Sequence, residues 1–140
     1  MQHRTMREIV RDQHPLVLGP DATVQEASAA MRQRRVGAVL VVDDDMHLLG
    51  IFTGRDALSC LAEDCHPRRT KLKNAMKRDP TTLPPGAHAE DALRLFEDAG
   101  FRHLPVVDQG RVVGIVSRYD FRADEHRRQN EETGFFEILR

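Results

Sequence analysis

Two pairs of hydroxyl and carboxylate residues, each with the same spacing, are the best candidates for polar chemistry in this chain. Thr53 precedes Asp56 by three positions, and Ser117 precedes Asp120 by three. Each pair follows a short apolar run with a Gly inside it, which is typical of a buried strand. A Ser or Thr there can cap a following helix, and an acidic residue three positions later favours the same helix end. The pairs are therefore either helix caps alone or caps that also face a ligand.

The two pairs belong to a longer internal repeat. A Pro-led entry, an Ala-rich helix, a Val-Val-Asp hairpin and a Gly-Ile segment recur in the same order, first 65 and then 64 positions apart. The one-residue deletion falls at the hairpin turn, where insertions and deletions are tolerated. A single copy of roughly 55–60 residues would bury only a modest core. We therefore expect two copies packed as a pseudo-twofold pair.

Hydrophobic periodicity predicts the same elements in both copies. For the first copy we expect a short amphipathic helix within residues 1–14 that ends at His14-Pro15, an extended piece at 16–18, a helix capped by Asp21 or Thr23, strands at 36–42 and 46–52, and a helix from Thr53 through Ala62. For the second we expect a helical lead-in at 72–76, a helix at 87–96, strands at 104–108 and 112–116, and a helix opening at Ser117.

The overall composition excludes several classes of function. The chain has 140 residues and a formal net charge of −1, so no global field attracts nucleic acid or an anionic membrane. No apolar run is long enough to span a bilayer, and the first residues lack the apolar segment of a signal peptide. We expect a cytoplasmic protein with neither nucleic acid nor membrane as partner.

Cys60 and Cys65 are the two cysteines of the chain. In a cytoplasmic protein they are expected to be reduced thiols, with Cys60 near the apolar side of its helix. A disulfide between them would require the helix to end between the two residues, which we do not expect. Together with His66 they fit no standard zinc spacing. A redox-responsive or metal-responsive module is the weakest of three functional hypotheses.

The ordered, repeated set of motifs resembles the CBS (cystathionine β-synthase) domain, and two in tandem resemble a CBS pair, or Bateman module. The resemblance implies an α/β (α+β) fold of two pseudo-twofold-related units, each a small three-stranded sheet with two helices. The boundaries we expect are 5–64 for the first unit, 65–73 for a linker, 74–127 for the second unit and 128–140 for a charged and apolar C-terminal tail.

The resemblance also implies a regulatory function. CBS pairs commonly bind adenosine-containing ligands such as AMP, ADP, ATP or S-adenosylmethionine in the cleft between the two units. Carried over by position, Asp56 and Asp120 would bond the ribose hydroxyls, with Thr53 and Ser117 beside them. A carboxylate only accepts hydrogen bonds and a vicinal diol offers two donors, while a helix N-terminus suits a phosphate.

Further ligand contacts are expected around each pair. Arg groups are suited to phosphate, and the second copy offers more of them near the expected phosphate position. The first copy has Leu40 where the second has Pro105, a departure from the family pattern that favours the second site. His103 could meet a phosphate or be a half-buried strand residue. The candidates are Arg102, His103 and Arg118 in the second copy, Arg55 in the first, and Val17, Ala38 and Thr82 for backbone and apolar contacts with adenine.

We expect no catalysis, because the sequence contains neither an assignable nucleophile–base set nor a Gly-rich phosphate loop. The resemblance implies a homodimer that signals to a regulated protein of unknown identity. The alternative is a structural or interaction module that serves dimerisation without a nucleotide. The apolar tail at residues 134–140 is expected to dock on the module or on a dimer mate.

Overall fold

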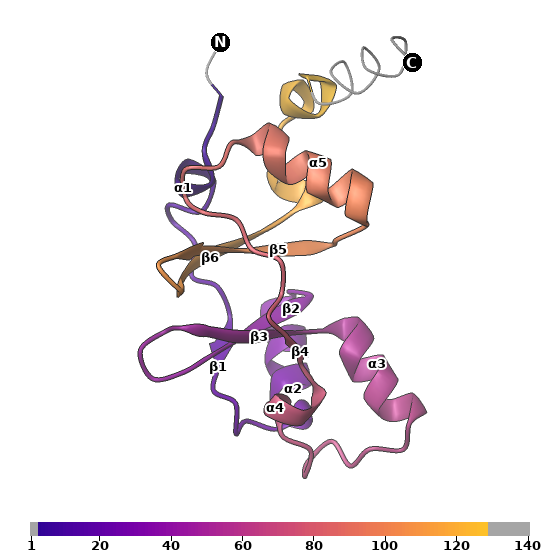
Figure 1. Cartoon of the computed structure of the whole chain (residues 1–140). Helices are drawn as coiled ribbons and strands as arrows, with labels where there is room; N and C mark the ends of the chain where they lie inside the picture. Colours follow the sequence, from indigo (N-terminus) through magenta and orange to yellow (C-terminus); the bar gives the residue numbers. More distant parts are fainter. Residues whose placement is uncertain (1–2, 129–140) are drawn as a thin grey trace. The chain divides into compact units, whose positions relative to one another are not determined.

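The computed structural model describes residues 3–128 and divides into two compact units (Figure 1). The first-repeat unit comprises His14–Thr81 and Val107–Val112. Among the described residues, the second-repeat unit comprises residues 3–13, Thr82–Val106 and residues 113–128. None of the helices within residues 3–128 has the length and apolar composition needed to cross a bilayer. The expected docking of residues 134–140 lies outside the described residues.

The first-repeat unit is built on a four-stranded sheet of order β1-β2-β3-β4. β2 is an uninterrupted apolar run and all its residues are buried. β1 lies parallel to β2, whereas β3 is antiparallel to both β2 and β4. The elements are β1 (Val17–Leu18), α2 (Val24–Arg34), β2 (Ala38–Val42), β3 (Leu48–Thr53), α3 (Gly54–Ala62), α4 (Leu72–Ala75) and β4 (Lys77–Arg78). Its core includes Val24, Ala27, Met31, Val39, Val41, Phe52, Cys60 and Leu72.

The second-repeat unit has a two-stranded sheet, β5-β6. Its elements are α1 (Met6–Ile9), α5 (Ala89–Ala99), β5 (His103–Asp108), β6 (Arg111–Ser117), the 3₁₀ turn η1 (Arg118–Asp120) and a helix at residues 123–128. The apolar side of α5 packs against the hairpin, as the helix covering β5 and β6 in Figure 1 shows. Its core includes Met6, Val10, Ala92, Leu93, Phe96, Leu104, Val106, Val116 and Phe121.

The α/β class is confirmed, but neither sheet has the three strands we expected: one has four and the other has two. In the second-repeat unit the counterpart of β1 is a single parallel bridge from Leu83 to Val106. The counterpart of β4 is a side chain: the Gln13 amide donates to the carbonyl of Ile115 at 2.7 Å and accepts from its N–H at 2.9 Å. Ile51, the equivalent of Ile115, pairs with the backbone of Lys77. The side-chain amide of Gln13 thus bonds the backbone groups of Ile115, whereas in the other unit strand β4 bonds those of Ile51.

Each unit contains the lead-in helix that precedes the other copy of the repeat. The N–H groups of Met6 and Arg7 donate to the carbonyls of Ala87 and Pro85, at 2.8 and 2.9 Å. The same contacts occur one repeat away: Leu72 N–H donates to Ala22 at 2.8 Å, and Lys73 N–H to Pro20 at 3.0 Å. The loops before α5 and α2 therefore accept from helix N–H groups that would otherwise lack partners.

The segment between α3 and α4 caps α2. Its carbonyls at Thr70 and Pro67 accept from the N–H groups of Val24 and Gln25, both at 2.9 Å. The Thr23 hydroxyl accepts from Glu26 N–H at 3.1 Å, so of the two expected caps Thr23 is the one used. Three of the four free N–H groups at the start of α2 are satisfied in this way.

The helix expected to open at Ser117 is interrupted. One 3₁₀ turn, η1, is followed by Phe121, whose extended backbone brings its ring into the core. The ring packs edge-on against Phe96 with 6.0 Å between centroids. The helix resumes at residue 123, where the Glu125 carboxylate accepts from the N–H of Arg122 at 2.8 Å. Burial of an aromatic side chain outweighs continuation of a polar helix.

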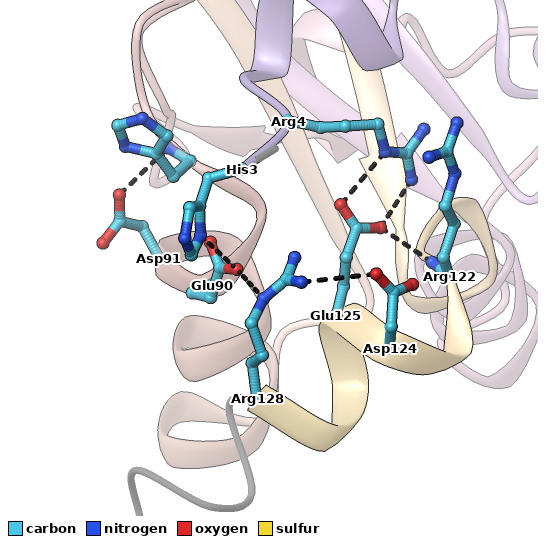
Figure 2. A network of polar contacts seen from close by, with 9 residues as sticks. His3, Arg4, Glu90, Asp91, Arg122, Asp124, Glu125 and Arg128 are labelled. Atoms are coloured by element: carbon cyan, nitrogen blue, oxygen red, sulfur yellow. Dashed lines mark hydrogen bonds and ion pairs between the residues drawn. The ribbon is translucent and has the colours of Figure 1, made fainter. Parts of the chain in front are cut away.

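A buried network of charges ties the start of the chain to the helix at residues 123–128 (Figure 2). Glu125 is 1% exposed and accepts from Arg4 Nε at 3.0 Å and Nη2 at 2.6 Å. Glu90, on α5, accepts from His3 at 3.0 Å and Arg128 at 2.8 Å. Burial opposes the ionisation of Glu125, but the bonds from Arg4 prevail and hold its pKa below the ordinary 4.5. The network compensates the cost of burying these charges.

The expectation that Cys60 and Cys65 are two reduced thiols is wrong, because the structure pairs them as a disulfide with 5.1 Å between their Cα atoms. The expectation assumed that the helix would carry the residues apart. Instead α3 ends at Ala62, and Asp64 adopts a left-handed conformation with φ 59°. The chain reverses there and returns Cys65 to Cys60.

The repeated Gly of the Gly-Ile segment marks a close approach of the chain. A Cβ on Gly50 would lie 2.6 Å from the carbonyl oxygen of Lys77 and 2.6 Å from Met76 Sδ. A Cβ on Gly114 would overlap the side chain of Val10. Both copies therefore need Gly for the same reason: the segment after a lead-in helix crosses the strand with no room for a side chain.

We expect Gly50→Ala to lower the free energy of unfolding by about 1–3 kcal/mol, because the β3 and β4 backbones must separate to admit a methyl group. Chemical denaturation of the purified variant measures this. Gly54→Ala is the matched control: its Cβ would meet nothing within 4 Å, at the first position of α3. That change should be neutral or stabilising by up to about 1 kcal/mol. Equal stabilities for the two variants would contradict the close-approach explanation.

We expect Glu125→Gln to destabilise the protein at pH 7 by on the order of 3 kcal/mol, because Arg4 then keeps a charge without its anionic partner. The pKa of Glu125 is lowered by folding, so its contribution is complete above about pH 4.5 and is lost as pH falls toward the folded pKa. The stability difference from wild type should therefore narrow in acid. Glu97→Gln, at an exposed position of α5, should stay within about 0.5 kcal/mol of wild type throughout. A pH-independent difference for Glu125→Gln would contradict the ion pair.

Candidate functional site

The first candidate pair lies where β3 ends and α3 begins. Thr53 N–H donates to Asp56 Oδ2 at 2.9 Å, and the Thr53 hydroxyl donates to the same oxygen at 3.1 Å. The pair forms a capping box, as the spacing predicted. Both side chains are partly exposed, so the cap is accessible from solvent.

The second pair repeats this geometry where β6 ends. Ser117 N–H donates to Asp120 Oδ2 at 2.6 Å, and the Ser117 hydroxyl donates to it at 3.3 Å. In both pairs Oδ2 carries the cap. Among residues 3–128, no group donates to Oδ1 of either Asp. Each carboxylate is thus held in one orientation with an acceptor oxygen still available.

The first-repeat unit holds its candidate residues on β1, β2, β3 and the first turn of α3, with Ala38 and Thr53 at one end of the central strand pair. Ala38, the first residue of β2, is the register partner of Thr53. Val17 pairs with Leu40, two residues further along β2. Arg55 is exposed in the first turn of α3. The set therefore combines the ends of two paired strands, a capped carboxylate and an exposed positive charge.

The second-repeat unit contains the other candidates. His103 begins β5 and is half-buried; burial lowers its pKa, Arg102 lowers it further and the Asp120 carboxylate opposes them. The imidazole is therefore neutral at pH 7, and it can donate or accept a hydrogen bond but brings no charge to a phosphate. Arg102 and Arg118 are exposed cations, and Thr82 is exposed beside Leu83.

Arg4 is a neighbour of the second site that the sequence did not reveal. Its Nη2 donates to the carbonyl oxygen of Asp120 at 3.1 Å while the guanidinium holds Glu125. It stands 116 positions from Asp120, outside the copy of the repeat to which that residue belongs. No local sequence pattern identifies such a contact. It arises because the segment before the first copy of the repeat packs in the same unit as the second copy.

One group of side chains has the composition of a metal site. The ligand atoms of Asp43, Asp45 and His47 lie within 4.8 Å of one another at the β2–β3 turn. Asp43 Oδ1, however, accepts from the N–H groups of Asp45 and His47, both at 2.9 Å. These bonds are those of a hairpin turn closed by an Asp side chain, which accounts for the cluster without an ion.

The comparisons with known proteins agree with this arrangement. The family model described as CBS domain matches residues 6–63 and 72–124. The CBS domain-containing protein YhcV of Bacillus subtilis is 32% identical over 117 residues, which are 84% of this chain and 81% of that protein. The uncharacterized protein MJ1225 of Methanocaldococcus jannaschii is 31% identical over 116 residues, but this chain, with 83% of its length aligned, spans only 41% of that relative.

A solved structure extends the likeness to the fold. The crystal structure of CBSX2 in complex with AMP superposes on this chain with a TM-score of 0.71 and 25% sequence identity. The superposition covers 84% of this chain and 92% of the CBSX2 chain. The repeat in the sequence, the matching geometry of its two capping boxes and both family matches lead to one conclusion: this chain belongs to the CBS domain family, with two CBS domains in tandem.

Proposed function

We propose that the protein is a regulatory module that binds an adenosine-containing ligand, with the ribose diol on Asp56, on Asp120 or on both. The observation that carries the proposal is the shared state of the two carboxylates. Each is fixed through Oδ2 by its own cap, and each keeps Oδ1 without a donor among the described residues. The AMP complex of CBSX2 supports adenosine as the ligand class.

The two sites would hold a phosphate by different means. α3 is a helix of nine residues, so the N-terminal end beside Thr53 offers the positive end of a helix dipole, with Arg55 close by. η1 is a single 3₁₀ turn of three residues and offers little dipole. The Ser117 site would instead rely on the exposed guanidinium groups of Arg102 and Arg118. We infer that the second site is the more sensitive to salt.

Signalling follows from ligand binding without catalysis. A ligand that prefers one arrangement of the module shifts the equilibrium by its difference in affinity, and a partner protein reads the change. We propose a cytoplasmic homodimer as the working form. Leu58 and Leu61 support the dimer: they lie three residues apart on α3 and are 66% and 64% exposed, a large apolar exposure for a helix face.

A structural module without a nucleotide is the second candidate, because the capping boxes are complete in the absence of any ligand. His88 and Asp91 illustrate it. They form the same box at the start of α5, with His88 N–H donating to Asp91 at 3.0 Å, and they belong to neither candidate site. The two candidates differ in whether the Asp residues of the repeat bind a diol.

We expect Asp120→Asn to weaken AMP binding, and the double change Asp56→Asn with Asp120→Asn to weaken it by about tenfold to a hundredfold, since a charge-assisted bond contributes roughly 1.5–3 kcal/mol. Isothermal titration calorimetry with AMP, ADP, ATP and S-adenosylmethionine measures this and ranks the ligands. 2′-Deoxy-AMP should bind wild type weakly, because it lacks half of the diol.

Asp91→Asn is the matched control, since it alters the same capping position outside both candidate sites. It should change stability as the site variants do and leave AMP affinity unchanged. AMP affinity equal to wild type in the double variant would show that the site assignment is wrong. Absence of binding by wild type to the whole ligand panel would favour the structural module.

A further inference from the structure

The end of α3 has the geometry of a Schellman motif. Cys65 N–H donates to the carbonyl of Cys60 at 2.9 Å, and Asp64 N–H donates to that of Leu61 at 3.3 Å. Asp64 occupies the left-handed position that this motif requires. The motif normally brings the side chains of its first and last residues into contact. Here both residues are cysteines, with Cα atoms 5.1 Å apart, within the range of disulfides.

We propose that Cys60 and Cys65 form a reversible dithiol–disulfide switch that fastens the end of α3 to the segment capping α2. The backbone bonds of the motif do not depend on the sulfur–sulfur bond. The two thiols therefore stay adjacent after reduction, and oxidation needs no search through the unfolded chain. A switch requires thiols that can be oxidised and reduced again while the protein stays folded, and the adjacency of these two thiols meets that requirement.

The two sulfurs differ in access. Cys60 is 5% exposed and belongs to the core of the first-repeat unit, whereas Cys65 is partly exposed beyond the helix end. A thiolate of an external dithiol attacks Cys65 Sγ, and the Cys60 sulfur leaves as a thiolate and is protonated. The second thiol of the dithiol, as its thiolate, then attacks the mixed disulfide and releases Cys65, which takes a proton. Two electrons and two protons pass to the protein, and the dithiol ends as its own disulfide.

The segment that follows Cys65 gives the switch a structural consequence. Pro67 and Thr70 accept from the first two N–H groups of α2, and Leu72 beyond them is fully buried. The disulfide closes a short loop from Cys60 to Cys65, and Cys65 also belongs to the segment that caps α2. Reduction removes that covalent constraint and leaves the start of α2 held by hydrogen bonds alone. The oxidised state therefore has the more ordered α2–α3 junction.

A functional consequence rests on the proposed function. Asp56 and Cys60 are four positions apart on α3, so they share one face of a helix of nine residues. A less ordered C-terminal end of α3 would therefore also affect the Thr53–Asp56 site at the start of the same helix. The Ser117–Asp120 site belongs to the other unit and contains no cysteine. We expect redox state to alter ligand affinity at the first site and leave the second unchanged.

Thiol counting and hydrogen exchange on the whole chain test the switch without any ligand. Protein oxidised with glutathione disulfide should show no reactive thiol after denaturation, and two after treatment with dithiothreitol. Reduction should speed exchange at Val24, Gln25 and residues 63–71 by at least about tenfold, with amides of α5 as the unchanged reference. The melting temperature should fall by about 5–10 °C. Removal of dithiothreitol and renewed oxidation should reverse all three changes.

Cys65→Ser supplies the permanently open state at a partly exposed position. It should match reduced wild type in melting temperature and exchange, and dithiothreitol should not affect it. Two free thiols after oxidation would overturn the proposal. So would identical exchange in oxidised and reduced wild type, a measurement that needs no variant to fold.

AMP titration of Asp120→Asn, oxidised and reduced, isolates the first site. We expect affinity at least about threefold weaker on reduction, with no such change in Asp56→Asn. Equal affinity in both states of Asp120→Asn would overturn the coupling to the ligand site. If Asp120→Asn binds no AMP in either state, the proposed function fails at that site, and thiol counting and exchange still decide whether the switch exists.

Discussion

The whole arrangement depends on hydrogen bonds from two very short helices to loops that are distant in sequence. α1 and α4 have four residues each, too few to be stable alone in water. The N–H groups of Met6 and Leu72 find acceptors in the loops before α5 and α2, and both side chains are fully buried. Neither copy of the repeat is therefore a self-sufficient unit, because each obtains part of its core from the segment that precedes the other. The same packing explains Gly50 and Gly114, because the segment after each lead-in helix passes so close to the strand that no side chain fits there.

The capping boxes show how a structural role and the proposed binding role can share one set of atoms. A carboxylate that accepts from its N-cap N–H through one oxygen has its rotamer fixed before any ligand arrives, which lowers the entropic cost of binding. The box at His88 and Asp91 has the same capping geometry and lies outside both candidate sites. The pairs at Thr53 and Ser117 differ from it in their position at a strand end, beside the start of the preceding strand of the sheet or hairpin. Location on the scaffold, rather than the motif itself, is what could convert a cap into a ligand contact.

Local chemistry was predictable from the sequence, and contacts across the repeat were not. The spacing of Thr53 and Asp56 predicted a cap, and the run from Val36 to Val42 predicted a buried strand, which in the structure begins at Ala38. The repeat and its family resemblance predicted the α/β class. The bonds from Arg4 to Glu125 and Asp120 join residues more than 100 positions apart, so no window of sequence contains them. The prediction for Cys60 and Cys65 was wrong for a local reason. The helix ends in a left-handed turn at Asp64. Asp tolerates this conformation but is also common in other conformations, so its presence does not predict the turn.

The two copies have diverged most in how they stabilise the chain after the hydroxyl–Asp pair. In the first-repeat unit the helix continues from Thr53 to Ala62 and ends in a disulfide. In the second the helix stops after one turn, Phe121 enters the core, and a new helix is held by the Arg4–Glu125 pair. A covalent bond responds to reductants, and an ion pair responds to acid and salt. Two hydroxyl–Asp pairs of nearly identical local geometry are thus followed by segments that different conditions would destabilise, so the symmetry of the repeat does not extend to the bonds that hold the chain beyond each pair.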